Sequence, residues 1–283
     1  MKFKIISKFN DSKSDSLENY GEDSKERVEY LKSIRNKKRI VKIIQVAILL
    51  GIILFWEVGA RVGIIDSFIM SQPSSIWATM ISLAKGDLWL HIGTTTLETL
   101  LGFFISTAIG LFIAIALWWS ETAQKIFQPY LVVINALPKI ALGPVIIIWV
   151  GVGMNAIIAM VVLICVVITT ITLLHGFCDV DKDMVFLLQS MGAKKHTVFL
   201  KLVFPSQIPL IISTTKINVG LAFVGAIMGE YLVSRAGLGY LIVYGGQVFN
   251  LDLVMTSTII LLLLAGGMYA IVAFIEKKLV ARR

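Results

Sequence analysis

The chain has 283 residues, of which 57% are hydrophobic and only 16% charged, and its mean hydropathy is +0.85. A soluble domain needs more polar surface than this composition supplies, so a cytosolic enzyme, a disordered chain and collagen are all disfavoured. The charges are also uneven, because residues 1–42 hold 12 of the 26 Lys and Arg and 7 of the 18 Asp and Glu. The sequence therefore predicts a charged N-terminal arm, residues 1–39, and a transmembrane domain, residues 40–283.

The arm is rich in Ser, Asp, Glu, Lys and Asn, which is typical of a solvated tail, and a specific docking role is the alternative. It does not resemble a secretory signal, because the first apolar run begins near Ile40 and no cleavage site follows. Cys165 and Cys178 have no CxxC pattern and no His at ligand spacing. We therefore expect neither a disulfide framework nor a metal site.

Six apolar runs are long enough to cross a bilayer as helices, which takes about 20 mostly apolar residues. They are residues 40–59, 96–119, 130–150, 156–174, 208–233 and 253–275. Pro138 and Pro144 interrupt the third run, which is the least suited to one straight helix. The predicted fold class is an all-α polytopic membrane protein with about six transmembrane helices.

The distribution of Lys and Arg predicts the orientation of these helices. With the N-terminus in the cytoplasm, cytoplasmic segments hold 21 Lys and Arg, and external segments hold three, Arg61, Lys85 and Arg235. We therefore expect both termini on the cytoplasmic side of the cell's inner membrane. Anchoring to anionic membrane lipid explains the pI of about 9.4, so no nucleic-acid partner is needed.

One cytoplasmic segment, residues 175–207, is too polar to span the membrane and too apolar for a flexible linker. Acidic residues precede an apolar run that begins at Met184, as at the N-terminus of a helix. Gly192 breaks the run, so we expect a helix, a turn and a second helix over about 194–204 that stops at Pro205. A calcium loop is excluded, because its sixth position requires Gly and holds Met184.

Such a helix pair has two interpretations, a surface helix lying along the membrane or a docking element for a cytoplasmic partner. The stretch Ser190-Met191-Gly192-Ala193, followed by Pro205, resembles the cytoplasmic "EAA" loop of importer permeases of the ATP-binding-cassette type. The Glu-Ala-Ala of that loop would fall on Phe186, Leu187 and Leu188, so here an apolar ridge replaces its polar part.

Further segments are similar to the branch of these permeases that carries nitrate, sulfonates and taurine. They are SQPS at residues 71–74, NALPKIALGP at 135–144, WVGVG at 149–153, GE at 229–230 and GLGYLI at 237–242. The resemblance covers about residues 45–280. It implies a small anionic solute such as a sulfonate, nitrate or taurine, with a thiamine precursor or another vitamin-like solute as the alternative.

The resemblance also implies the partners of the chain. Two copies would form the pathway, two ATP-binding subunits would hold ATP and Mg, and an external substrate-binding protein would deliver the solute. The chain contains no Gly-x-x-x-x-Gly-Lys-[Ser/Thr] loop, so we expect it to be no enzyme and to bind no cofactor or metal itself. The residues expected to couple it to the ATPase are Met184, Phe186, Leu187, Leu188, Met191, Gly192, Ala193, Lys194 and Pro205.

Polar side chains within apolar spans are costly in lipid and are therefore candidates for the pathway or its gate. These candidates are Asn135, Lys139, Lys216, Asn218 and Glu230. Lys216 has a second interpretation, which is snorkelling to the interface, and Glu230 could instead cap a helix or pair across a dimer. Glu98, near the start of the second span, is expected at the membrane interface. Gly225-x-x-x-Gly229 is expected to allow close helix packing.

Two other classes compete with the importer. An intramembrane enzyme needs a catalytic set at membrane depth, but His91, His175 and His196 lie outside the predicted spans or at their edges. An ion-gradient-driven carrier does not need the helix–glycine–helix segment. Both classes explain less of the sequence than an importer permease does.

Overall fold

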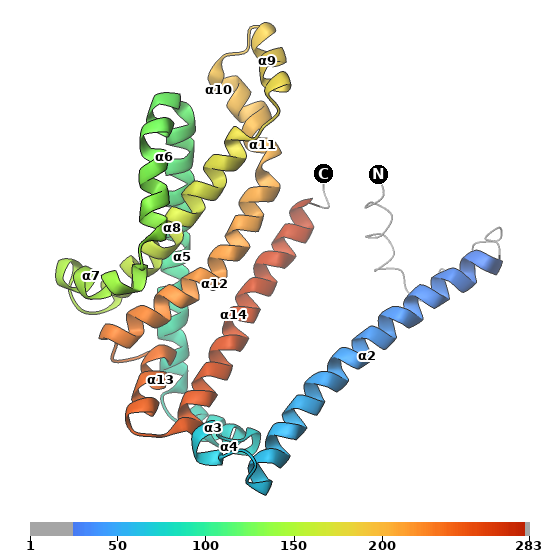
Figure 1. Cartoon of the computed structure of the whole chain (residues 1–283), viewed down its shortest axis with the longest axis vertical. Helices are drawn as coiled ribbons and strands as arrows, with labels where there is room; N and C mark the ends of the chain where they lie inside the picture. Colours follow the sequence, from blue (N-terminus) through green and yellow to red (C-terminus); the bar gives the residue numbers. More distant parts are fainter. Residues whose placement is uncertain (1–24, 281–283) are drawn as a thin grey trace. The chain divides into compact units, whose positions relative to one another are not determined.

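The computed structural model describes residues 25–280 of the chain (Figure 1). Residues 1–24, which hold most of the predicted arm and its solvated tail, and residues 281–283 lie outside the described residues. The chain divides into two compact units, with the division between Ser74 and Ser75.

The first unit contains α2 (Lys25–Val62), α3 (Ser67–Met70) and the start of α4 (Pro73–Ala84). Residues Tyr30–Val62 form a candidate span, which confirms the first predicted run and extends it in both directions. Helix α2 begins well before residue 39, the predicted end of the arm. The Lys, Arg and Glu residues in this part of the arm are good helix formers and allow the helix to start there. The indole Nε1 of Trp56 donates to the carbonyl of Ser71 at 3.2 Å, which ties the end of α2 to the turn before α4.

The second unit is a helical bundle. Its elements after α4 are α5 (Leu88–Trp119), α6 (Glu121–Ala136), the 3-10 turn η2 (Lys139–Leu142), α7 (Gly143–Val150), α8 (Met154–Cys178), α9 (Lys182–Ser190), α10 (Lys195–Val198), the π-helical turn η3 (Phe199–Val203), α11 (Phe204–Ser206), α12 (Ile208–Val233), α13 (Leu238–Gln247) and α14 (Leu251–Val280). Helices α5, α8, α12 and α14 are long and apolar enough to cross a membrane, which confirms the second, fourth, fifth and sixth predicted runs.

The third predicted run is a bent pair rather than one helix. Helix α6 and the η2–α7 segment meet at an angle of 87°, with Pro138 at the break. The pair begins at Glu121 instead of residue 130, because Ser120 caps α6 and its Oγ accepts from the N–H of Ala123. Counting this pair as one span, the described residues contain six candidate spans, as predicted.

Helix α8 packs against both α5 and α12, and this contact forms the core of the bundle. The central buried side chains are Phe103, Ile157, Val161, Ile164, Val219, Ala222 and Phe223. A Cβ at Gly225 would lie 2.7 Å from the Cα of Val161, and one at Gly229 would lie 2.9 Å from the Cα of Ile157. The backbones of α12 and α8 therefore approach closely through these two glycines, which confirms the predicted packing role.

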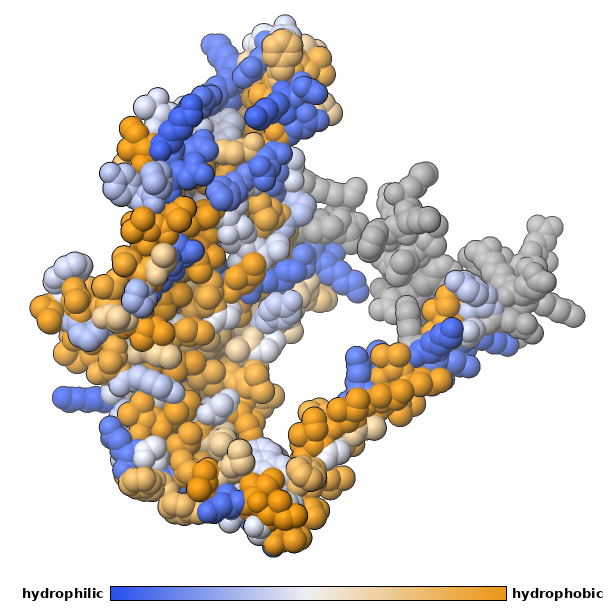
Figure 2. All heavy atoms as spheres, viewed as in Figure 1, coloured by the Kyte–Doolittle hydropathy of each residue, from blue (hydrophilic) through white to orange (hydrophobic). Residues whose placement is uncertain are grey.

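Helix α12 connects two different ends of this bundle. Its 26 residues correspond to about 39 Å of continuous helix. One end follows α9, α10 and α11, and the other leads into α13 (Figure 1). In Figure 2, hydrophilic side chains gather toward the α9 and α10 end, and apolar side chains cover the middle of the bundle, as a membrane-spanning bundle requires.

Candidate functional site

The polar segment forms the predicted helix–turn–helix at one end of the bundle. Helix α8 continues to Cys178, so the segment begins at Asp179 rather than at residue 175. Helix α9 is capped by Asp181, whose carboxylate accepts from the N–H of Asp183 at 2.9 Å. Gly192 makes the turn with a φ of +85°, which favours glycine.

Pro205 does not stop the second helix, contrary to our prediction. It lies within α11, which continues directly from η3, and the chain remains helical to Ser206. The π-helical turn η3 precedes it, and the break comes at Gln207. The second half of the segment is therefore several short turns in sequence rather than one regular helix.

Five rings fix this second half to the bundle, and we call them the aromatic anchor: Trp118, Trp119, Phe177, Phe199 and Phe204. The centroids of Trp118 and Phe199 are 4.8 Å apart, and Trp118 Nε1 donates to the carbonyl of Phe177 at 3.1 Å. Lys195 Nζ donates to the carbonyl of Trp119 at 3.0 Å and lies 5.3 Å from the centroid of a Trp118 ring. The ends of α5 and α8 thus hold the segment directly.

Helix α9 has an exposed face and an inward face. The exposed apolar side chains, which we call the coupling ridge, are Met184, Phe186, Leu187 and Met191. Phe186 is 71% exposed and Met191 77% exposed, at the end of the bundle where polar residues gather. Leu188 instead turns inward with Ala193 and packs on the cluster around Phe177, while Lys194 is exposed. An exposed apolar group of this kind marks a contact surface.

The predicted pathway candidates lie in separate places. Lys139 Nζ donates to Asn135 Oδ1 at 3.0 Å, at the bend between α6 and η2. Lys216 Nζ forms an ion pair with Glu276 at 2.7 Å, and this pair joins α12 to α14. The partner of Lys216 could not be foreseen, because Glu276 lies in the charged C-terminal turns of another helix.

Asn218 is fully buried between three helices. Its Nδ2 donates to Thr169 Oγ1 on α8 at 2.7 Å and to Thr107 Oγ1 on α5 at 3.2 Å. The side chain therefore holds α12 to α5 and α8 by hydrogen bonds in the interior of the bundle.

Glu230, at the other end of α12, is 1% exposed and belongs to a group of side chains that we call the capping cluster: His91, Thr95, Glu98 and Glu230. Glu230 Oε1 accepts from Thr95 Oγ1 at 2.6 Å, and Oε2 accepts from the N–H of Gly239.

The capping cluster accepts hydrogen bonds from the backbone N–H groups at the start of α13. Thr95 Oγ1 accepts from the N–H of Leu238 at 2.8 Å, and His91 Nδ1 accepts from the N–H of Gly237 at 2.9 Å. These N–H groups have no carbonyl partner within the helix, and the carboxylate of Glu230 lies at the positive end of its dipole. Side chains from α5 and α12 therefore fix the position of α13.

Glu98 does not lie exposed at an interface, contrary to our prediction. It is 2% exposed, because α5 begins at Leu88 and places residue 98 well inside the bundle. The sequence did not predict the roles of His91, Thr95 and Glu98, and its one hint was the GLGYLI motif near Glu230.

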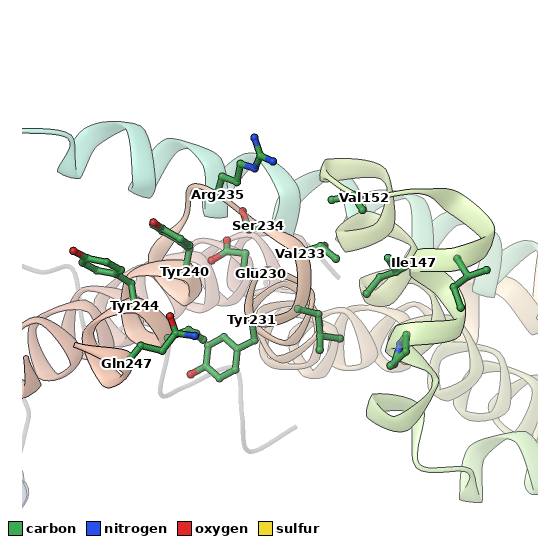
Figure 3. A pocket seen from close by; sticks show the side chains of 14 residues that line it. Ile147, Val152, Glu230, Tyr231, Val233, Ser234, Arg235, Tyr240, Tyr244 and Gln247 are labelled. Carbon is green, nitrogen blue, oxygen red and sulfur yellow. The ribbon is translucent and has the colours of Figure 1, made fainter. Parts of the chain in front are cut away.

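A cavity of about 610 Å³ opens beside this cluster (Figure 3). Its lining comes from α7, the end of α12, the following loop and α13, and it includes Glu230, Tyr231, Arg235, Tyr240, Tyr244 and Gln247. Among the five predicted pathway candidates, Glu230 lines this cavity and the other four do not. The cavity lies near the end of α12 that is remote from the coupling ridge.

The chain resembles transport permeases in sequence and in fold. Residues 106–282 match the family described as "Binding-protein-dependent transport system inner membrane component". The formylaminopyrimidine transport permease protein ThiX of Halalkalibacterium halodurans is 29% identical over 68% of this chain and 76% of that protein. The putative aliphatic sulfonates transport permease protein SsuC of Escherichia coli is 25% identical over 81% of this chain and 87% of that protein.

Solved structures show the same fold. A chain of the MetNI methionine ABC transporter in an inward-facing conformation aligns with a TM-score of 0.58 at 17% identity, covering 69% of this chain and 96% of that one.

Proposed function

Because the chain belongs to the family of binding-protein-dependent transport system inner membrane components, we propose that two copies of it line a translocation pathway driven by two ATP-binding subunits. The chain is an importer permease of the ATP-binding-cassette type and a multi-pass protein of the inner membrane. ATP and Mg bind to the partner subunits, and a substrate-binding protein delivers solute from outside.

The coupling ridge supports this proposal most directly. Four apolar side chains stand exposed on α9 at the polar end of the bundle, and a groove on an ATP-binding subunit would bury them. Gly192 allows the turn beside the ridge, and the aromatic anchor links that turn to α5 and α8. Movement of the partner subunit would thus be transmitted to the bundle as a rigid-body change.

The orientation of the chain is part of the proposal. The coupling ridge and both termini lie in the cytoplasm, where most Lys and Arg residues of the loops are found. The charged arm, residues 1–39, precedes the permease domain, residues 40–283. Lys32, Arg35, Lys37 and Arg39, which lie on α2, contact anionic lipid at the inner leaflet.

The solute in this proposal is a small anion such as a sulfonate, nitrate or taurine, in keeping with the relative named for aliphatic sulfonates. The alternative is a vitamin-like solute, since another relative is named for formylaminopyrimidine transport. A thermal-shift screen of the partner binding protein against sulfonates, nitrate and pyrimidines separates the two.

The proposal is tested at Leu187 in the complex with its ATP-binding subunit. Leu187→Asp places a charge on the coupling ridge and should abolish co-purification of the subunit and ATP-dependent uptake. Gln189→Asp adds the same charge on the same helix at an exposed polar position outside the ridge, and should retain both. Retention of the subunit by Leu187→Asp would contradict the proposed docking surface.

A further inference from the structure

Two stacked tyrosine rings, Tyr240 and Tyr244, line the cavity beside the capping cluster, and His91 stacks on Tyr240 outside the lining. The rings of His91 and Tyr240 lie 6.0 Å apart at 12°, and those of Tyr240 and Tyr244 lie 6.0 Å apart at 18°. Tyr231 lines the cavity from α12 (Figure 3). Tyr244, at the end of the row, is 45% exposed. Offset stacking occurs at such centroid distances, so a flat ring bound in the cavity can extend the row.

Arg235 supplies positive charge to the same cavity. Its guanidinium forms no ion pair or hydrogen bond with any residue in the part of the chain that the structure describes. The neighbouring carboxylate of Glu230 is already engaged, since its two oxygens accept from Thr95 and Gly239. A free guanidinium binds carboxylate or sulfonate oxygens through paired hydrogen bonds.

The volume of the cavity indicates the size of the anion that it can hold. Sites for small organic ligands enclose about 300–1,000 Å³, and this cavity of about 610 Å³ lies within that range. A nitrate ion would occupy a small part of it. Ile147, Val233 and Val243 line it as well, so an apolar body would be in contact with apolar side chains.

We propose that this cavity is a binding site for an organic anion that carries a flat ring, with the ring against Tyr240 and Tyr244 and the anionic group at Arg235. The inference rests on the proposed function, because it places the site on the outer side of the bundle, remote from the coupling ridge. A solute released by an external binding protein reaches this side first. The inference narrows the solute class to aromatic or heteroaromatic sulfonates and carboxylates.

The test measures binding to the full-length chain, assembled with its ATP-binding subunits in lipid nanodiscs. The probes are benzenesulfonate, methanesulfonate, which has the same charged group without a ring, and benzyl alcohol, which has a ring without charge. Isothermal titration should show benzenesulfonate binding at least about tenfold more tightly than either other probe, because it makes both contacts.

Two variants separate the ring contact from the charge contact. Tyr244→Leu should weaken benzenesulfonate about fivefold and leave methanesulfonate unchanged. Arg235→Gln should weaken both sulfonates and leave benzyl alcohol unchanged. Both side chains are exposed, so neither change disturbs the core. Phe249→Leu is the matched control, because Phe249 is 72% exposed and does not line the cavity.

Equal affinity for benzenesulfonate and methanesulfonate, or an unchanged affinity in Tyr244→Leu, overturns the inference. Co-purification of the ATP-binding subunits is scored in the same preparations. If the wild-type chain fails to retain them, the proposed importer function fails instead, and the two failures are distinguishable.

Discussion

Thr95 on α5 and Glu230 on α12 are 135 residues apart in sequence and are joined by a buried hydrogen bond of 2.6 Å. The same Thr95 hydroxyl accepts from the N–H of Leu238, so one side chain connects three helices. Thr95→Val keeps the shape of the side chain and removes both bonds. We expect it to lower the free energy of unfolding by about 2–3 kcal/mol, because a buried N–H and a carboxylate oxygen lose a partner. Thermal unfolding in detergent measures this change in stability. Thr95→Ser keeps the hydroxyl and should therefore retain most of the stability that Thr95→Val loses.

Glu98 is expected to stabilise the bundle because its polar side chain fills a buried position on α5. Glu98→Gln keeps the size and polarity of this side chain, and its thermal midpoint should stay near that of the wild type. Glu98→Ala removes the polar group and leaves a void, which should cost about 2–4 kcal/mol. A Gln variant as unstable as the Ala variant would contradict this role of the Glu98 side chain.

The glycine contact between α12 and α8 gives a matched pair of variants. Gly225→Ala would place a methyl group 2.7 Å from the Cα of Val161, whereas a Cβ at Gly220 on the same helix meets nothing within 4 Å. Gly225→Ala should therefore destabilise the bundle by about 1–3 kcal/mol, and Gly220→Ala should be neutral or slightly stabilising. Comparing the thermal unfolding midpoints of the two variants separates the effect of steric contact from that of helix propensity. Equal midpoints would contradict the close approach of α12 and α8 at Gly225.

The ion pair between Lys216 and Glu276 is expected to hold α12 against α14. Lys216→Glu places two carboxylates together and should lower both thermal stability and ATP-dependent uptake. The exchanged double variant, Lys216→Glu with Glu276→Lys, should recover most of both. If the double variant behaves as the sum of the two single variants, the residues are not coupled.

The sequence predicted the apolar spans well, because a run of about 20 apolar residues has few other uses. The fifth span agrees in both bounds, from Ile208 to Val233. The bend at Pro138 was only partly predicted. Prolines mark a weak point in a helix, but the 87° angle depends on how the neighbouring helices pack.

The functional surfaces were less predictable than the spans. The sequence predicted the first helix of the segment and the turn at Gly192, but not the short turns that follow. It also could not say which apolar side chains of α9 turn inward, so Leu188 was grouped with the residues that couple to the ATPase. The capping cluster was missed because its contacts join residues more than 100 positions apart, and periodicity detects only local structure. The cavity was missed for the same reason, since α7, α12 and α13 each contribute only part of its wall.

The bond between Thr95 and Glu230 also limits how the bundle can move. A tilt of about 5° in a helix of about 39 Å displaces each end by about 1.7 Å, which is more than a hydrogen bond tolerates. While the bond is intact, α5 and α12 can therefore tilt relative to each other only about this point, and the wall of the cavity beside it stays in place. Any change in the width of the cavity then comes from its opposite wall, where α7 follows the bend at Pro138.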